Sequence, residues 1–187
     1  MTVFEFLLTL YAIVAGLGVS LLVRSIGQMI EARGRVRLYW VHSFWIVLTF
    51  VAHVVSWFTV WRFRNHAQWT VLEALLLLCA PILLYLISHL AVPELEDDRV
   101  HDMRDYYFVQ VRWTQGLLLG VIIVGALSHR LIESTFDLSG APGVRAAIAL
   151  TLIPGIASVR PRVHEVQAVL LMLAILFAVS YVLRPIG

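Results

Sequence analysis

The sequence predicts an all-α, polytopic integral membrane protein: a single bundle of six transmembrane helices with short loops. Hydrophobic residues make up 60% of its 187 residues and charged residues only 14%, whereas soluble domains have roughly 45–50% apolar and about 25% charged residues. Apolar runs also recur along the chain at about the 20 residues that a helix needs to cross a hydrocarbon layer of ~30 Å. We therefore expect residues 1–187 to form one transmembrane domain.

Hydropathy places each expected span, and each should be helical because a lipid-exposed backbone has to satisfy its own N–H and C=O groups. The first span carries Glu5 where a cleaved signal peptide has Lys or Arg, so we expect it to be retained. Trp40, Trp61 and Trp69 fall at span ends, as expected of rings that favour the membrane interface. The expected spans are residues 3–23, 38–61, 69–92, 111–131, 141–159 and 163–184.

The distribution of arginine predicts the orientation. All fourteen basic residues are Arg, and the loops on the side of the first connection hold most of them. Arg-rich loops stay in the cytoplasm, so we expect both termini on the outer side of a membrane, most simply a bacterial inner membrane. No dense basic tract is present, so the sequence gives no sign of nucleic-acid binding.

The sequence contains no motif for catalysis. It has no HExxH, no Gly-rich phosphate loop and no CxxC, and its one cysteine, Cys79, lies in an apolar run. We therefore predict no catalytic residue, no cofactor and no metal site, and an enzyme is the less favoured class. Hydrolysis of lipid headgroups by surface His and Asp residues is the one enzymatic alternative.

Polar groups inside the spans are the first functional candidates, because such groups are costly to insert into lipid. His42, Thr49 and His53 recur at helical spacing on one stripe of the second span, which should face protein and not lipid. Glu73 and His89 lie in the third span. An antiparallel hairpin of these spans sets His42 beside His89 and brings His53 within reach of Glu73. This arrangement predicts a proton or ion path in which His53 and Glu73 exchange protons.

The competing interpretation of the same residues is structural. In it, His53 donates a hydrogen bond to a neighbouring helix, and Glu73 turns back to the interface to meet Arg62 or Arg64. The function that we rank first is a small channel or transporter that acts as a homo-oligomer, since six short-looped helices enclose little volume. The second predicts a non-catalytic membrane subunit, sensor or scaffold that docks other membrane subunits through charged cytoplasmic loops.

Residues 92–105 hold half of the chain's acidic residues and form the expected cytoplasmic connector before the fourth span. If a helix begins after Pro93, four polar side chains of this segment share one helical face. The like charges on that face repel one another, and the Arg-rich segment 24–37 on the same side of the membrane is the expected partner. A divalent cation held by the acidic face is the less favoured alternative. The docking or registry candidates are Asp98, His101, Asp102, Asp105, Arg33, Arg35 and Arg37.

Overall fold

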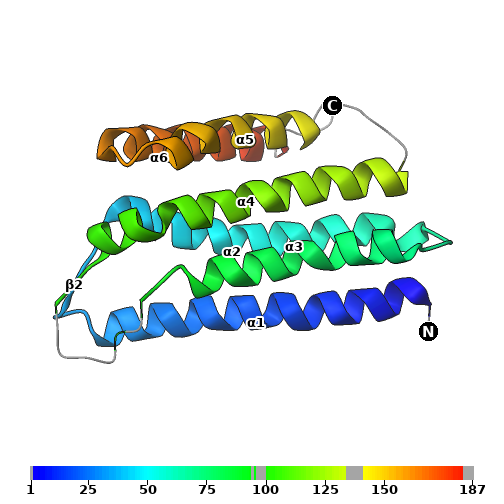
Figure 1. Cartoon of the computed structure of the whole chain (residues 1–187), viewed down its shortest axis with the longest axis horizontal. Coiled ribbons are helices and arrows are strands. Elements are labelled where there is room, and N and C mark those ends of the chain that lie inside the picture. Colours follow the sequence, from blue (N-terminus) through cyan, green and yellow to red (C-terminus); the bar gives the residue numbers. More distant parts are fainter. Residues whose placement is uncertain (1, 94, 96–99, 134–140, 183–187) are drawn as a thin grey trace.

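The computed structural model describes residues 2–93, 95, 100–133 and 141–182, and most of them are helical (Figure 1). A one-turn 3-10 helix, η1 (Arg62–Asn65), follows the second helix. Two short strands, β1 (Val36–Arg37) and β2 (His101–Asp102), lie in the loops. The helices are α1 (Val3–Glu31), α2 (Trp40–Trp61), α3 (Val71–His89), α4 (Met103–Glu133), α5 (Ala141–Ala157) and α6 (Pro161–Val182).

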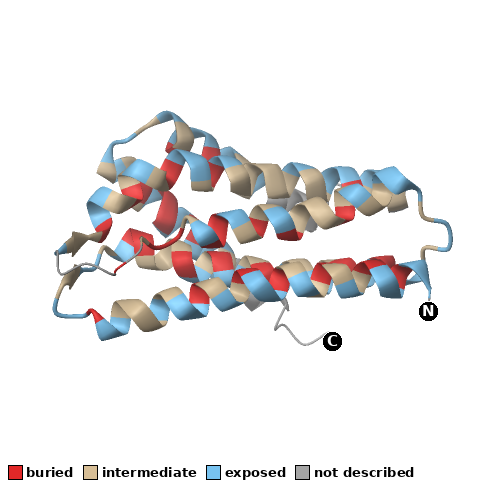
Figure 2. Ribbon diagram, turned by 60° about the horizontal axis from the view of Figure 1, so that its bottom comes forward, coloured by how far each residue is buried: buried red, intermediate tan, exposed pale blue. Residues whose placement is uncertain are grey.

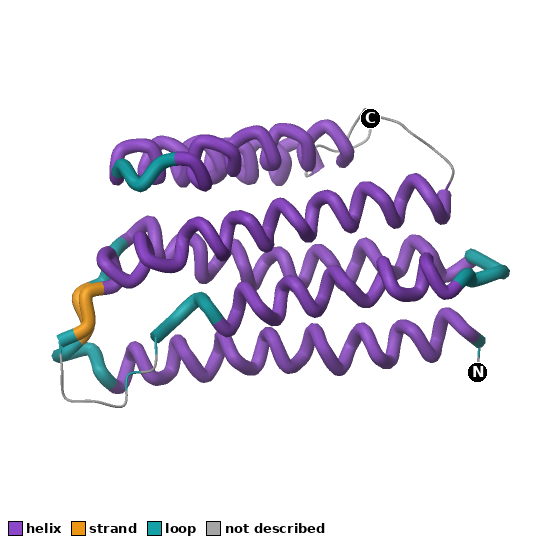
Figure 3. Tube along the Cα trace, in the orientation of Figure 1, coloured by secondary structure: helices purple, strands orange, loops and turns teal. Residues whose placement is uncertain are grey.

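The helices lie side by side along one long axis (Figures 1 and 3). α3 packs between α1 and α4, and α2 packs against α1 and α3. α5 packs against α4, and α6 packs against α5 and α2. We call the end where α1 and α3 begin the N-terminal end. The opposite end, where β1 and β2 pair, is the bridge end.

Four helices, α1 to α4, are long and apolar enough to cross a membrane, and Ala146–Ala157 of α5 is a shorter apolar helix. Large apolar residues such as Phe58 and Leu72 are exposed, and exposed residues occur along all the helices (Figure 2). Such a surface is unfavourable in water and suits lipid. Helix length and composition therefore support four membrane-crossing helices. They do not establish the six spans expected from the sequence.

Two helices extend beyond the limits that hydropathy predicts. α1 continues past residue 23 to Glu31, and α4 begins at Met103 and not at residue 111. Hydropathy detects only the part of a helix that is apolar, so polar extensions escape it. The starts of α1 and α3 are set by capping boxes, in which Thr2 pairs with Glu5 and Thr70 with Glu73.

The bridge end joins the Arg-rich segment to the connector through the backbone. β1 and β2 pair in parallel, with Val36 opposite His101 and Arg37 opposite Asp102. The expectation that His101 and Asp102 share a helical face with Asp105 is wrong, because the chain is extended there and α4 begins only at Met103. Instead, the Asp102 carboxylate accepts the Arg104 N–H at 2.8 Å, as a residue that caps a helix start does.

Candidate functional site

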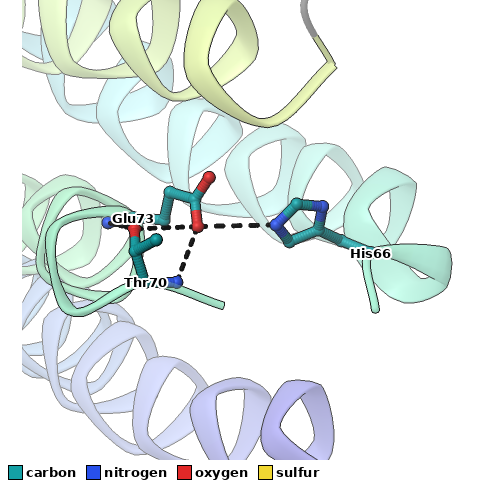
Figure 4. Close-up of polar contacts among 3 residues, drawn as sticks. All are labelled: His66, Thr70 and Glu73. Atoms are coloured by element: carbon teal, nitrogen blue, oxygen red, sulfur yellow. Dashed lines mark hydrogen bonds and ion pairs between the residues drawn. The ribbon is translucent and has the colours of Figure 1, made fainter. Parts of the chain in front are cut away.

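Glu73 lies at the N-terminal end, in the first turn of α3 (Figure 4). Its Oε2 atom accepts hydrogen bonds from the backbone N–H of Thr70 at 2.7 Å and from the Thr70 hydroxyl at 2.9 Å. The Nε2 atom of His66 is 3.5 Å from the same oxygen. These contacts give Glu73 a structural role, since its carboxylate closes the cap of α3 and pairs with the loop that precedes it.

His53 is buried between α2 and α1, and the residue is only 2% exposed. Its Nδ1 donates to the Thr49 carbonyl of the same helix at 3.0 Å. The Nε2 atom points at Gly18 of α1, where any Cβ atom would overlap it. Within the described residues Nε2 has no hydrogen-bond partner. The structure thus gives His53 and Glu73 separate sets of contacts and does not bring them together.

The rest of the expected stripe is buried as well. His42 Nε2 donates to the Ala91 carbonyl at 2.7 Å, which ties the start of α2 to the chain just after α3. Thr49 donates its hydroxyl to the Trp45 carbonyl at 2.8 Å. His89, the expected neighbour of His42, is exposed at the last residue of α3.

A buried hydrogen-bond chain that the sequence interpretation missed joins α4 to α6. His164 is fully buried, and its Nε2 donates to the Ser158 carbonyl at 2.8 Å. Its Nδ1 is therefore the acceptor of the Tyr107 hydroxyl, at 3.0 Å. His164 lies inside the expected span 163–184 and was an available signal, whereas Tyr107 lies in the part of α4 that precedes the expected span.

A second buried pair, also missed, lies among α4, α5 and α6. The side-chain amides of Gln115 and Gln167 donate to each other's oxygens at 3.0 and 3.3 Å. Both residues are almost fully buried. Gly155 of α5 lies directly over the pair, and a Cβ atom there would overlap the oxygen of Gln115. A glutamine inside each of two apolar spans was the available signal, but neither glutamine was taken as a candidate.

The charged candidates lie at the bridge end. Arg33, Arg37 and Asp105 are exposed, whereas Arg35 and His101 are half-buried, and the His101 N–H donates to the Arg35 carbonyl at 2.8 Å. Asp98 lies outside the described residues. Within the described part of the chain, no three His, Cys, Asp or Glu side chains are grouped so as to hold a metal ion.

An open apolar cleft of about 410 Å³ lies among the described residues. Most of its lining residues come from α2 and α4, and Tyr11 of α1, Leu77 of α3 and Leu171 of α6 are among the others. Most of its lining residues are apolar, and the polar ones include Ser56, Thr59, Ser128 and His129.

Comparisons with protein-family models, with curated proteins and with solved structures each found no significant match to this chain.

Proposed function

We propose that this protein is a non-catalytic membrane subunit or sensor that docks partner subunits through its charged bridge end. One observation carries the proposal: the polar groups within the helices serve as links between or within helices. His42, Glu73 and His164 each hydrogen bond to a neighbouring segment. Polar side chains that form such hydrogen bonds hold the helices in one arrangement. The exposed charged side chains then remain available to bind a partner subunit.

The proposal includes six membrane-crossing helices in a bacterial inner membrane, with both termini on the outer side. Its support is the number of helices and the Arg-rich loops at the bridge end, which would then face the cytoplasm. β1 and β2 hold the Arg-rich segment beside the connector. A partner, either a second copy of the chain or another membrane subunit, would meet both segments as one charged surface.

Charge reversal tests the docking surface. We expect Arg33→Glu with Arg37→Glu to weaken assembly in native membranes about tenfold, because exposed pairs contribute up to about 1 kcal/mol each. Crosslinking followed by sizing measures the assembled fraction. Arg160→Glu with Arg162→Glu, two exposed arginines after α5, is the matched control and should leave assembly unchanged. Equal effects of the two pairs, or a wild-type protein that stays a single chain, would contradict this surface.

A homo-oligomeric proton or ion transporter is the second candidate. The observation that favours it is the buried Nε2 of His53, which has no hydrogen-bond partner among the described residues. A proton path requires such a free titratable position.

Proton flux separates the two candidates. In proteoliposomes under a pH gradient we expect the wild-type protein to give no flux above that of protein-free liposomes, because the contacts of His53 and Glu73 form no continuous polar route. His53→Ala and Glu73→Gln should then change nothing. Flux in the wild type that either substitution abolishes would replace the subunit proposal with the transporter.

A further inference from the structure

One buried histidine joins the start of α6 to α4. His164 lies in the first turn of α6 and is fully buried. Its ring packs edge-on against the rings of Tyr107 and Phe108 of α4, with 5.4 and 5.3 Å between centroids. The loop between α5 and α6 lies at the bridge end of the bundle (Figure 3). The contact therefore holds α6 in place at the end of the molecule where the charged segments lie.

Both ring nitrogens of His164 form a hydrogen bond when the ring is neutral. Nε2 donates to the Ser158 carbonyl at 2.8 Å, and Nδ1 accepts the hydrogen of the Tyr107 hydroxyl at 3.0 Å. A protonated imidazole carries a hydrogen on each nitrogen and accepts no hydrogen bond. The hydrogen of Tyr107 would then point at an N–H group, and the hydroxyl would have to turn away. The observed hydrogen bond between α4 and α6 therefore requires the neutral form of His164.

The surroundings of His164 do not favour a positive charge. Among the described residues His164 forms no ion pair, and the partner of its Nε2 is an uncharged carbonyl. The one carboxylate close by, Glu165, lies towards the Tyr39 hydroxyl. A buried charge without a partner is costly, so a protonated ring is more stable in water. The titratable and charged groups around His164 and Tyr107 are Tyr39 and His42 of α2, Arg104 of α4, and Arg160, Arg162 and Glu165 of the α5–α6 loop and α6.

We propose that His164 is an acid-sensitive latch between α4 and α6. The neutral ring holds the start of α6 against Tyr107, and protonation releases the start of α6 with the loop before it, so that the charged ring reaches water. The released loop carries Arg160 and Arg162, both of which are exposed. This latch goes beyond the proposed docking function and does not depend on it.

The direction of the pH dependence follows from where the proton binds. The held state excludes the proton, and the released state binds it with the ordinary affinity of histidine, near pH 6.5. The ratio of released to held protein should therefore be constant above about pH 7.5 and rise towards tenfold per pH unit below about pH 6.5. Between about pH 7.5 and 5.5 the ratio rises about tenfold.

Spin-label distances measure this release without a change at His164. Cysteines replace Val109 of α4 and Val166 of α6, which are 71% and 59% exposed, after Cys79, the one native cysteine, is replaced by alanine. In liposomes we expect a main α4–α6 distance at neutral pH. A second, longer distance should grow about tenfold relative to the first between about pH 7.5 and 5.5. An α4–α6 distance distribution that does not change with pH would overturn the latch.

A reference pair of labels separates local release from general acid unfolding. Ile13 of α1 and Leu75 of α3 are exposed positions on two helices that pack against each other, and His164 contacts neither helix through a hydrogen bond or a ring. The distance between labels at Ile13 and Leu75 should be the same throughout the pH series. An equal change in both pairs would mean that acid opens the whole bundle, and it would overturn the latch.

Two substitutions assign the response to one histidine. His164→Gln keeps a polar side chain that does not titrate, so the α4–α6 distances should no longer depend on pH. His42→Gln is the matched control, because His42 is also buried and its ring also contacts Tyr107; this variant should keep the tenfold response. A response that survives in His164→Gln, or that is lost in His42→Gln, would overturn the role of His164.

The tyrosine is tested at neutral pH. Tyr107→Phe removes the hydrogen bond to Nδ1 and keeps the ring, so the ratio of released to held protein should rise about three- to tenfold, the range for one lost hydrogen bond. An unchanged ratio would overturn the role of the hydroxyl in the latch. The wild-type pH series with both label pairs needs no substitution at Tyr107 or His164, so it tests the latch even where a variant fails to fold.

Discussion

Gly155→Ala is expected to destabilise the protein by about 2 kcal/mol, even though alanine is the better helix former by ~1 kcal/mol. The new methyl group would overlap the oxygen of Gln115 and lie 2.6 Å from that of Gln167. The two amides bond to each other and are buried, so neither can move aside without losing a partner. Overpacking of this kind typically costs about 1–3 kcal/mol, and a broken buried hydrogen bond costs a similar amount. Unfolding by SDS in mixed micelles measures the change in free energy.

The control for this prediction is Gly116→Ala on α4, where the added Cβ atom meets nothing. That substitution should be neutral or stabilise the protein by up to about 1 kcal/mol, because only helix propensity changes. The clash also predicts a rescue: with Gln115→Ala and Gln167→Ala already in place, Gly155→Ala should no longer destabilise. If Gly155→Ala behaves like Gly116→Ala in the wild-type background, the three helices do not meet at this point.

The sequence predicted the helices well because their cause is local. An apolar run of sufficient length becomes a helix in lipid whatever its neighbours are, so α2 and α3 begin and end within a few residues of the expected spans. The polar stripe on α2 was also predictable, since helical spacing fixes which residues share a face, and His42, Thr49 and His53 are all buried.

The partners of those side chains were not predictable, because they depend on how each helix is rotated against the others. His53 was expected near Glu73 from depth alone, but its ring faces Gly18 of a different helix. Glu73 was expected to be either a titrating group or a partner of the loop arginines. The Thr-x-x-Glu sequence that begins at Thr70 is a capping box, and this local signal would have shown the role of Glu73 without any structure.

Gly18→Ala is expected to have the second large effect, again by about 2 kcal/mol of lost stability. The His53 imidazole fills the space where the new Cβ atom would lie, and the hydrogen bond from its Nδ1 to the Thr49 carbonyl limits how far the ring can turn. Either α1 and α2 separate, or the ring leaves its pocket and that hydrogen bond is lost. SDS unfolding in mixed micelles again measures the loss.

Gly16→Ala lies on the same helix and serves as the matched control, since a Cβ atom there meets nothing. It should be neutral or slightly stabilising. In the double variant Gly18→Ala with His53→Ala the overlap is gone. The loss of stability caused by Gly18→Ala should therefore be about 1–2 kcal/mol smaller in the His53→Ala background than in the wild type, and this difference is the coupling energy of the two residues. Additive losses would mean that Gly18 and His53 do not touch. A positive coupling would show that the most deeply buried histidine of α2 holds two helices at close approach, and this is the role that the subunit proposal requires of it.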